Sequence, residues 1–219
     1  MLTTTEDVRV WRVDVRRAAA WAESASVRLL QPEERERAER GTPDVRRRRL
    51  VSRAALRVAL GSWLERPPAS IRFSSDRYGK PTIAGSDAHF SVSTSGGCCL
   101  VAVSGRGPIG VDVEAVVPLP ELDDLVASRF APAEAAAIVR LPRESRLRAF
   151  YNCWTRKEAC LKATGVGLAE GLDRVAVTVD DERPTIVSLD GDDPAAWRLA
   201  AVDAGPGLVG AVAVRAAGT

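Results

Sequence analysis

Three short apolar segments follow one another in the middle of the chain, and they limit the possible folds more than any other feature. The segments are HFSVSTS (89–95), CCLVAVS (98–104) and PIGVDVEAV (108–116), and only a few glycine-containing residues separate them. Short apolar or alternating runs bounded by glycine and proline are typical of strands. The sequence therefore predicts three consecutive strands joined by tight turns.

Helical segments lie on both sides of these strands. Residues 45–64 carry apolar side chains at helical spacing, and Pro67 and Pro68 end that helix. Further helices are predicted at 32–40, 121–130, 132–141 and 144–163, and residues 165–171 break the helical run. The remaining strands are predicted at 7–15, on both sides of an Asp-Arg-Tyr-Gly turn within 71–83, and, as an antiparallel meander, at 175–179, 185–189, 197–203 and 208–214.

The order of the elements divides the chain into two comparable halves. Each half contains one long helix and several strands, with the boundary between residues 108 and 109. Runs of strands with segregated helices favour an α+β fold. An internal duplication is suggested by the order of elements only, because no repeat is visible at the level of residues.

The composition excludes several classes of protein. With 219 residues, of which 46% are hydrophobic and 27% charged, the chain is typical of a globular protein. It shows neither a signal peptide nor a run long enough to cross a bilayer, so we expect a cytoplasmic protein. The single histidine, His89, excludes a histidine-based metal site or triad, and no P-loop or GxGxxG motif occurs. The four cysteines form no CxxC pair and are expected to be buried thiols.

Lysine is rare in this chain. Twenty-eight arginines stand against three lysines, Lys80, Lys157 and Lys162. A GC-rich genome favours arginine without any physical reason. A lysine ammonium is compact and can shift its pKa, whereas a guanidinium is a fixed fork. Lysines kept against the bias are therefore candidates for phosphate contact or proton transfer.

Two carboxylates in GVDVE have the spacing of a metal site. Asp112 and Glu114 are two residues apart on a predicted strand, so both side chains point to one face. Carboxylate oxygens of this kind suit Mg²⁺, which is usually held by one or two carboxylates together with substrate phosphates and water. A solvated strand face would show the same pattern, so the spacing alone leaves both interpretations open.

The segment WTRKEACLK (154–162) is a second candidate. Trp154, Glu158 and Lys162 are four residues apart and share one stripe of a helix, with Lys157 next to it. An exposed Glu-Lys pair would explain the charges equally well. Apolar residues flank them on both sides, however, which indicates partial burial. A third carboxylate and two lysines would complete a site for magnesium and phosphate.

Basic residues gather around the first long helix. They comprise Arg35, Arg37, Arg40 and the run Arg46 to Arg49. Only one or two of four consecutive residues can face a single ligand, and a solvated face or a nonspecific nucleic-acid patch would also explain them. Lys80 follows a glycine in a turn where the backbone can approach a phosphate closely.

These motifs occur together, and in the same order, in one family. RYGKPTI (77–83), HFSVSTS, GVDVEAV (110–116) and FYNCWTRKEACLKATGVGL (150–168) resemble the Sfp-type phosphopantetheinyl transferases. These enzymes move the phosphopantetheine arm of coenzyme A onto a serine of a carrier protein. Each motif is weak alone. GVDVE followed about forty residues later by WTRKEACLKATGxGL is specific to the family.

The resemblance implies a pseudo-dimer of two similar α/β subdomains packed side by side, with coenzyme A and Mg²⁺ in the cleft between them. Residues 1–108 would supply the coenzyme A-binding elements, and residues 109–219 the metal strand and the WTRKEACLK helix. By the match of motifs, the metal ligands would be Asp112, Glu114 and Glu158. The coenzyme A contacts would be an arginine of the 35–37 segment, taken as Arg37, then Arg47 or Arg48, Lys80, Ser93, Thr94, Lys157 and Lys162.

The resemblance also implies the chemistry. The carrier serine attacks the inner phosphate of the coenzyme A pyrophosphate, and adenosine bisphosphate leaves. Glu158 would accept the serine proton, directly or through water, and Lys162 would stabilise or protonate the leaving phosphate. Lys157 would assist as a third catalytic group. The partner would be an apo acyl- or peptidyl-carrier protein, and the chain itself is expected to be a monomer. Binding to nucleic acid or to a membrane is not expected.

One position departs from the family pattern. The family commonly shows Ser-His-Ser where this chain has Ser93-Thr94-Ser95, and that histidine contacts a coenzyme A phosphate. A threonine can donate one hydrogen bond but cannot carry charge, so weaker coenzyme A binding is expected unless arginines, or His89, compensate. The carrier is expected to dock around residues 119–130, through Leu122, Val126 and Phe130 beside Arg129.

Two other functions fit part of the pattern. A magnesium-dependent nuclease or other phosphohydrolase would use the same three carboxylates, but it leaves WTRKEACLKATG unexplained. A coenzyme A- or carrier-binding module that lost its activity together with the histidine is the nonenzymatic alternative. The retained set of Asp, Glu and Lys argues against that module.

Overall fold

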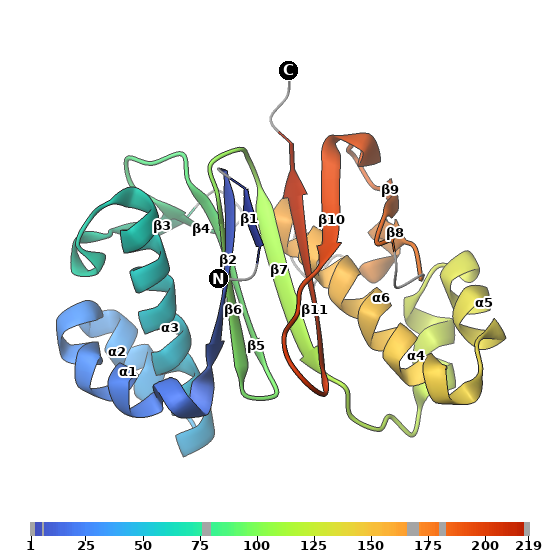
Figure 1. Cartoon of the computed structure of the whole chain (residues 1–219), viewed down its shortest axis with the longest axis horizontal. Coiled ribbons are helices and arrows are strands. Elements are labelled where there is room, and N and C mark those ends of the chain that lie inside the picture. The colour runs from blue at the N-terminus through green and yellow to red at the C-terminus, as the bar shows by residue number, and fades with distance from the viewer. Residues whose placement is uncertain (1–2, 6, 76–79, 166–170, 180–182, 217–219) are drawn as a thin grey trace.

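Two antiparallel sheets form the centre of the molecule (Figure 1). The computed structural model describes residues 3–5, 7–75, 80–165, 171–179 and 183–216. In strand order, the first sheet consists of β1 (Thr3–Thr5), β2 (Val8–Asp14), β6 (Cys98–Ser104) and β5 (His89–Ser95). The second consists of β10 (Trp197–Ala201), β11 (Leu208–Arg215) and β7 (Ile109–Ala115). The three strands predicted from the central segments are therefore confirmed, and they are divided between the two sheets.

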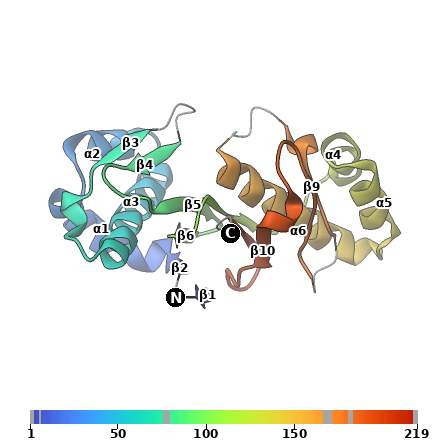
Figure 2. The same ribbon diagram turned by 90° about the horizontal axis from the view of Figure 1, so that it is seen from above.

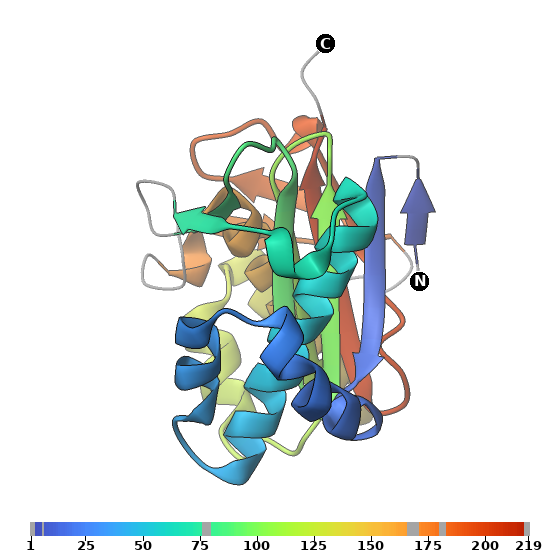
Figure 3. The same ribbon diagram turned by 90° about the vertical axis from the view of Figure 1, so that its left-hand side faces the viewer.

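Helices cover the outer face of each sheet (Figures 1 and 2). The first sheet carries α1 (Val15–Leu29), α2 (Pro32–Glu39) and α3 (Pro43–Leu64), which lie in front of its strands in Figure 3. The second carries α4 (Leu122–Arg129), α5 (Pro132–Arg140) and α6 (Arg143–Thr164). None of the helices in the described ranges is both long and apolar enough to span a membrane.

Alternation along the strands sorts the side chains into separate cores. On β6, Cys99, Val101 and Val103 pack with α3, while Leu100 and Ala102 point to the other face. There they meet Val111 and Val113 of β7, so the inner faces of the two sheets pack against each other. Successive strand residues point to opposite faces, and both faces of β6 are apolar because a helix covers one and the second sheet the other.

Serine side chains join the two sheets where β5 meets β7. The backbone N–H of Val111 donates to Ser91 Oγ at 3.1 Å, and that of Ala115 donates to Ser95 Oγ at 3.2 Å. These bonds replace the backbone ladder that would merge the sheets into one. The serines of HFSVSTS therefore hold the two halves together without making them a single sheet.

The halves repeat one arrangement. The order β2-β6-β5 of the first sheet corresponds to β7-β11-β10 of the second, and each half has one 22-residue helix on its sheet. Two small hairpins, β3 (Phe73–Ser75) with β4 (Pro81–Ile83) and β8 (Val175–Val177) with β9 (Ile186–Leu189), also correspond. The prediction of an α+β fold made of two similar subdomains is confirmed.

Two details of the predicted fold were wrong. Helix α1 was not expected, although Asp14 caps it by accepting a hydrogen bond from the Arg17 N–H at 2.9 Å. The four C-terminal strands do not form one meander, because β8 and β9 pair only with each other while β10 joins β11 and β7. The predicted turn at 76–79 and residues 166–170 of the predicted break lie outside the described residues.

Candidate active site

A glycine brings the helix of the WTRKEACLK motif against the strand of the GVDVE motif. A Cβ built on Gly110 would lie 1.9 Å from the carbonyl oxygen of Ala159, so only glycine permits this approach of β7 and α6. With Val111 and Val113 turned to the inner core, Asp112 and Glu114 share the opposite face of β7. The two motifs, about forty residues apart in sequence, therefore meet directly.

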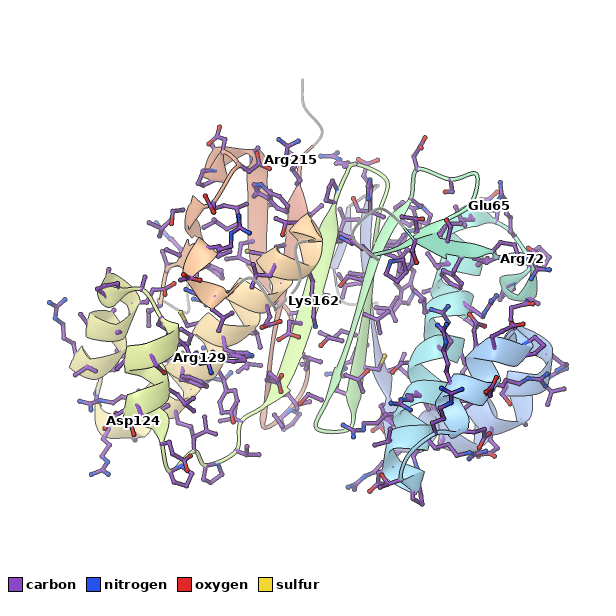
Figure 4. All side chains as sticks on the ribbon, turned by 180° about the vertical axis from the view of Figure 1, so that it is seen from behind. Glu65, Arg72, Asp124, Arg129, Lys162 and Arg215 are labelled. Atoms are coloured by element: carbon purple, nitrogen blue, oxygen red, sulfur yellow. The ribbon has the colours of Figure 1, made fainter. Side chains whose placement is uncertain are left out.

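Asp112 is the centre of the polar cluster that results. Its Oδ1 accepts hydrogen bonds from Lys162 Nζ at 2.6 Å and from Ser93 Oγ at 2.7 Å. Lys162 Nζ also donates to Ser93 Oγ at 3.0 Å. On the same strand face, Glu114 Oε2 accepts from Ser95 Oγ at 2.8 Å. The cluster thus combines β5 and β7, from either side of the junction, with the last turn of α6, where Figure 4 labels Lys162.

Glu158 lies one helical turn before Lys162 and is buried. Burial, followed by the carboxylates of Asp112 and Glu114, raises its pKa to about 7, and the Lys162 ammonium opposes this rise. Burial also raises the pKa of Glu114, against the hydrogen bond from Ser95. A neutral carboxylic acid in a buried acidic cluster avoids the cost of an uncompensated charge. The mutual effects show that the three carboxylates influence one another electrostatically.

The same cluster contains carboxylate oxygens without a hydrogen-bond partner. Asp112 Oδ2 and Glu158 Oε1 are buried and unbonded within the described residues. A buried polar atom of this kind is costly unless a proton, a cation or a donor reaches it. As they stand, no three Asp, Glu, His or Cys side chains of the described ranges are arranged to hold a metal ion together. The chemistry of the two unbonded carboxylate oxygens suits a divalent cation, although the cation that contacts Asp112 in this structure is the Lys162 ammonium.

An arginine-lined groove begins beside this cluster, on the first half. It has a volume of about 1040 Å³ and runs between α2, α3, β3 and β5. A second hollow of about 410 Å³ shares Arg53, Leu56, Pro81 and Val92 with it and reaches Lys80, Lys162 and Gly165. The guanidinium-bearing residues of the groove are Arg37, Arg40, Arg48, Arg49 and Arg53, against the single carboxylate of Glu34. Such a lining favours a ligand with several negative charges.

The structure distinguishes between the arginines that the sequence left open. Arg37 and Arg48 line the groove, as does Thr94, whose Oγ1 lies 2.8 Å from Ser52 Oγ. Arg47 instead pairs with Asp44 at 2.8 Å and lines a separate hollow. His89 begins β5 and does not line the groove. Thr94 is therefore the hydroxyl-bearing side chain of β5 that is placed to meet a groove ligand, next to Val92.

Sequence analysis missed Arg53 and Ser52. The Arg53 guanidinium lies 4.0 Å from the centre of the Phe73 ring, and its Nε donates to Glu34 at 2.6 Å. The signal was present, because residues 45, 48, 49, 52, 53 and 56 recur at the spacing of one helix face, and all line the groove.

Lys80 and Lys157 lie differently from what was expected. Lys80 Nζ donates to the carbonyl oxygens of Lys162 at 2.7 Å and Ala163 at 2.8 Å, so it binds the C-terminal end of α6 from the opposite half. Lys157 is 0% exposed, and its Nζ donates to Glu134 Oε2 at 2.6 Å. Lys157 therefore lies buried on another side of α6 from Lys162, and its role as a coenzyme A contact or catalytic group stays a prediction.

The expected apolar docking surface on α4 is wrong as well. Val126 and Phe130 are buried in the core of the second half, and Leu122 packs against that core. Only the basic residue of that set, Arg129, is exposed (Figure 4). The apolar spacing of α4 therefore reflects packing on α6. The four cysteines are free thiols and buried, as expected.

Comparisons with known proteins agree with this arrangement. The 4'-phosphopantetheinyl transferase superfamily matches residues 108–213. The 4'-phosphopantetheinyl transferase HetI of Nostoc sp. is 31% identical over 215 residues, which cover 96% of this chain and 88% of that protein. The 4'-phosphopantetheinyl transferase Sfp of Bacillus subtilis is 28% identical over 180 residues, 81% of this chain and 79% of that protein.

Among solved structures, the holo-[acyl-carrier-protein] synthase of Thermotoga maritima matches 52% of this chain and 65% of its own, with a TM-score of 0.41 and 18% identity. The match to HetI extends over both halves and both motifs of the polar cluster. The chain belongs to the 4'-phosphopantetheinyl transferase superfamily.

Proposed function

We propose that this chain transfers the phosphopantetheine moiety of coenzyme A to a serine of an apo carrier protein, with release of adenosine bisphosphate. The observation that carries the proposal is the junction of the halves. There, a buried cluster of carboxylates with unbonded oxygens lies beside Lys162 at the end of an arginine-lined groove. Membership of the superfamily supports the same reaction. The acceptor would be an acyl- or peptidyl-carrier protein, so the activity would be of the holo-[acyl-carrier-protein] synthase type.

The carboxylates are the groups that would hold Mg²⁺. Asp112 and Glu158 each offer a buried oxygen without a partner, and Glu114 is on the same strand face as Asp112. When bound, the ion would neutralise the pyrophosphate and the charge that develops on it. Lys162 would then have to exchange its bond with Asp112 for one with a phosphate oxygen. Its half-buried position and short distance from Ser93 leave it within reach of the cleft.

The groove is the place for the nucleotide end of coenzyme A. Arg37, Arg48 and Thr94 line it, and Lys80 borders the hollow that continues toward Lys162. Guanidinium groups bind phosphates in a bidentate way at any working pH, which offsets the missing histidine charge at Thr94. The pyrophosphate would lie between the groove and Asp112, in contact with Ser93 and Lys162.

Each polar residue of the cluster has a separate task in the proposed mechanism. Glu158, on the α6 turn before Lys162, would take up the proton of the attacking serine, directly or through water. Lys162 stabilises charge on the leaving phosphate. Ser93 holds the Lys162 ammonium and the Asp112 carboxylate in a fixed relation, since its hydroxyl bonds to both. The division of labour places coenzyme A recognition in residues 1–108 and the reacting groups mainly in residues 109–219.

A direct test is the mass of a carrier. An apo acyl-carrier protein and an apo peptidyl-carrier domain are incubated with the chain, coenzyme A and Mg²⁺, and each is weighed by mass spectrometry. We expect the mass of the carrier to increase by one phosphopantetheine group. This increase should not occur in the presence of EDTA or with the Asp112→Ala variant. Binding of coenzyme A without any mass gain on either carrier would instead favour a binding module. Hydrolysis of phosphate esters without transfer would favour a phosphohydrolase.

A further inference from the structure

The two halves carry the same buried ion pair at equivalent places. In the first half Glu34, on α2, pairs with Arg57, on α3, at 2.8 Å. In the second half Glu134, on α5, pairs with Lys157, on α6, at 2.6 Å. Both cationic side chains are 0% exposed. The residue numbers differ by one hundred in both cases, and the two long helices begin at Pro43 and Arg143.

The local structure around the two glutamates is also the same. Glu34 and Glu134 are each the third residue of a helix that begins with proline. Each carboxylate accepts the N–H of the residue before that proline, Gln31 at 2.8 Å and Ala131 at 2.7 Å. A carboxylate that closes a helix N-terminus in this way has a fixed position. The paired cation on the long helix is therefore held at a defined place in each half.

The first half has an ion pair equivalent to Glu134–Lys157 but lacks the acidic cluster, so comparing the two halves separates the role of the pair from that of the cluster. On β2, which corresponds to β7, the face toward α3 carries Trp11 and Val13, whereas the face of β7 away from the inner core carries Asp112 and Glu114. Val58 follows Arg57 as Glu158 follows Lys157. A half without metal-binding groups nevertheless keeps the buried pair. The pair thus belongs to the scaffold that seats each long helix, and it does not require the acidic cluster.

In the second half, the Glu134–Lys157 pair also affects the next residue of α6, Glu158. Glu134 Oε1 also accepts the Val177 N–H at 2.8 Å, so one carboxylate connects α5, β8 and α6. The Lys157 ammonium additionally lies 5.4 Å from the centre of the Phe130 ring. Adjacent residues of an α-helix are about 100° apart around its axis. Holding Lys157 therefore determines the direction in which Glu158 points.

We infer that the Glu134–Lys157 pair is a positioning device that turns Glu158 and Lys162 of α6 toward Asp112, and that Lys157 does not touch coenzyme A. The inference rests on the proposed function for the role of Glu158 and Lys162. The equivalent Glu34–Arg57 pair serves the groove instead, since Glu34 lines it and holds Arg53. The two pairs should therefore affect different ligands.

The test uses the same substitution in both halves. Glu134→Gln and Glu34→Gln are compared with the wild type for Mn²⁺ binding by electron paramagnetic resonance, coenzyme A binding by calorimetry, and transfer kinetics. Mn²⁺ is the probe because it shares the oxygen ligands of Mg²⁺. For Glu134→Gln we expect at least fivefold weaker Mn²⁺ binding and at least tenfold lower kcat, with the dissociation constant of coenzyme A within twofold. For Glu34→Gln we expect at least fivefold weaker coenzyme A binding and Mn²⁺ binding within twofold.

Two further variants keep the inference open to refutation if Glu134→Gln does not fold. Lys157→Arg gives the second half the same cation that the first half has at Arg57. This variant should keep Mn²⁺ binding and kcat within threefold of the wild type. Glu134→Gln combined with Lys157→Met removes both charges and should repeat the loss of Mn²⁺ binding without a loss of coenzyme A binding. Weaker coenzyme A binding in either Lys157 variant, or unchanged Mn²⁺ binding in the double variant, would overturn the inference. A wild-type protein that neither binds Mn²⁺ nor transfers the arm would overturn the proposed function first, and this inference would fall with it.

Discussion

Replacing Glu158 by glutamine should make the metal-free protein more stable at pH 8, although it removes a residue of the proposed active site. Glu158 is 4% exposed, and its Oε1 has no hydrogen-bond partner within the described residues. Burial and the nearby carboxylates raise its pKa from 4.5 to about 7. At pH 8 the native state therefore has to hold a charge that the buried cluster disfavours.

The sign and size of the effect follow from proton linkage. Between pH 4.5 and 7 the native state binds more protons at Glu158 than the unfolded state does, so stability falls as the pH rises through this window. A shift of this size corresponds to about 3 kcal/mol at pH 8. The amide of glutamine also needs partners, and an unmet buried amide costs about 1–2 kcal/mol. A net gain of about 1–2 kcal/mol is therefore expected for Glu158→Gln at pH 8, and none below about pH 4.5.

Urea denaturation in the presence of EDTA, at several pH values between 4.5 and 8, measures this gain. Glu144→Gln is the matched control, because Glu144 is an exposed carboxyl in the first turn of the same helix, and it should show no gain that grows with pH. Adding Mg²⁺ and coenzyme A should stabilise the wild type and stabilise Glu158→Gln much less. If Glu158→Gln is only as stable as the wild type at pH 8, or less stable, then the buried charge of Glu158 does not destabilise the native state and the reasoning is refuted.

The remaining predictions concern the approach of α6, the groove and the carrier. Gly110→Ala should lower the free energy of unfolding by more than about 2 kcal/mol in urea denaturation, because its Cβ would meet the Ala159 carbonyl; an unchanged midpoint would contradict the close contact. Thr94→His should keep transfer activity and should bind coenzyme A as well as the wild type or better below pH 6.5 in calorimetry. His89→Gln should leave coenzyme A affinity unchanged across pH 6–8 in the same assay. A steep pH dependence of wild-type affinity that His89→Gln abolishes would instead assign the phosphate contact to His89. If Lys80 acts by holding the end of α6, Lys80→Ala should reduce kcat/KM at least fivefold for both coenzyme A and 3'-dephospho-coenzyme A. A reduction seen with coenzyme A alone would show that Lys80 contacts the 3'-phosphate instead. Arg129→Glu should raise the KM for the carrier and leave that for coenzyme A unchanged, since Arg129 is exposed on α4, away from the groove; equal changes in both would exclude Arg129 from the carrier surface.

Periodicity and spacing determined much of this protein without a structure. The strand at 109–115 was predictable because valines alternate with Asp112 and Glu114, and the helix predicted at 144–163 because the helical run after Pro118 continues until the break at 165–171. The joint occurrence of the two motifs pointed to the family. Local rules suffice here because the direction of a side chain along one element depends only on the element's own geometry.

Only the tertiary structure decided which residues of those elements face each other. On α6, Lys157 and Glu158 are neighbours in sequence, yet Lys157 is buried against Glu134, whereas Glu158 lies one turn before Lys162, which contacts Asp112. Leu122, Val126 and Phe130 have a pattern that fits a docking surface or a core, and packing on α6 makes them core. The repeat of the halves was equally hidden, because the two ion pairs use different cations, Arg57 and Lys157, and the corresponding faces of β2 and β7 carry apolar residues in one half and carboxylates in the other. A sequence specifies the pattern of one face at a time, whereas a site depends on contacts between elements that are far apart in the chain.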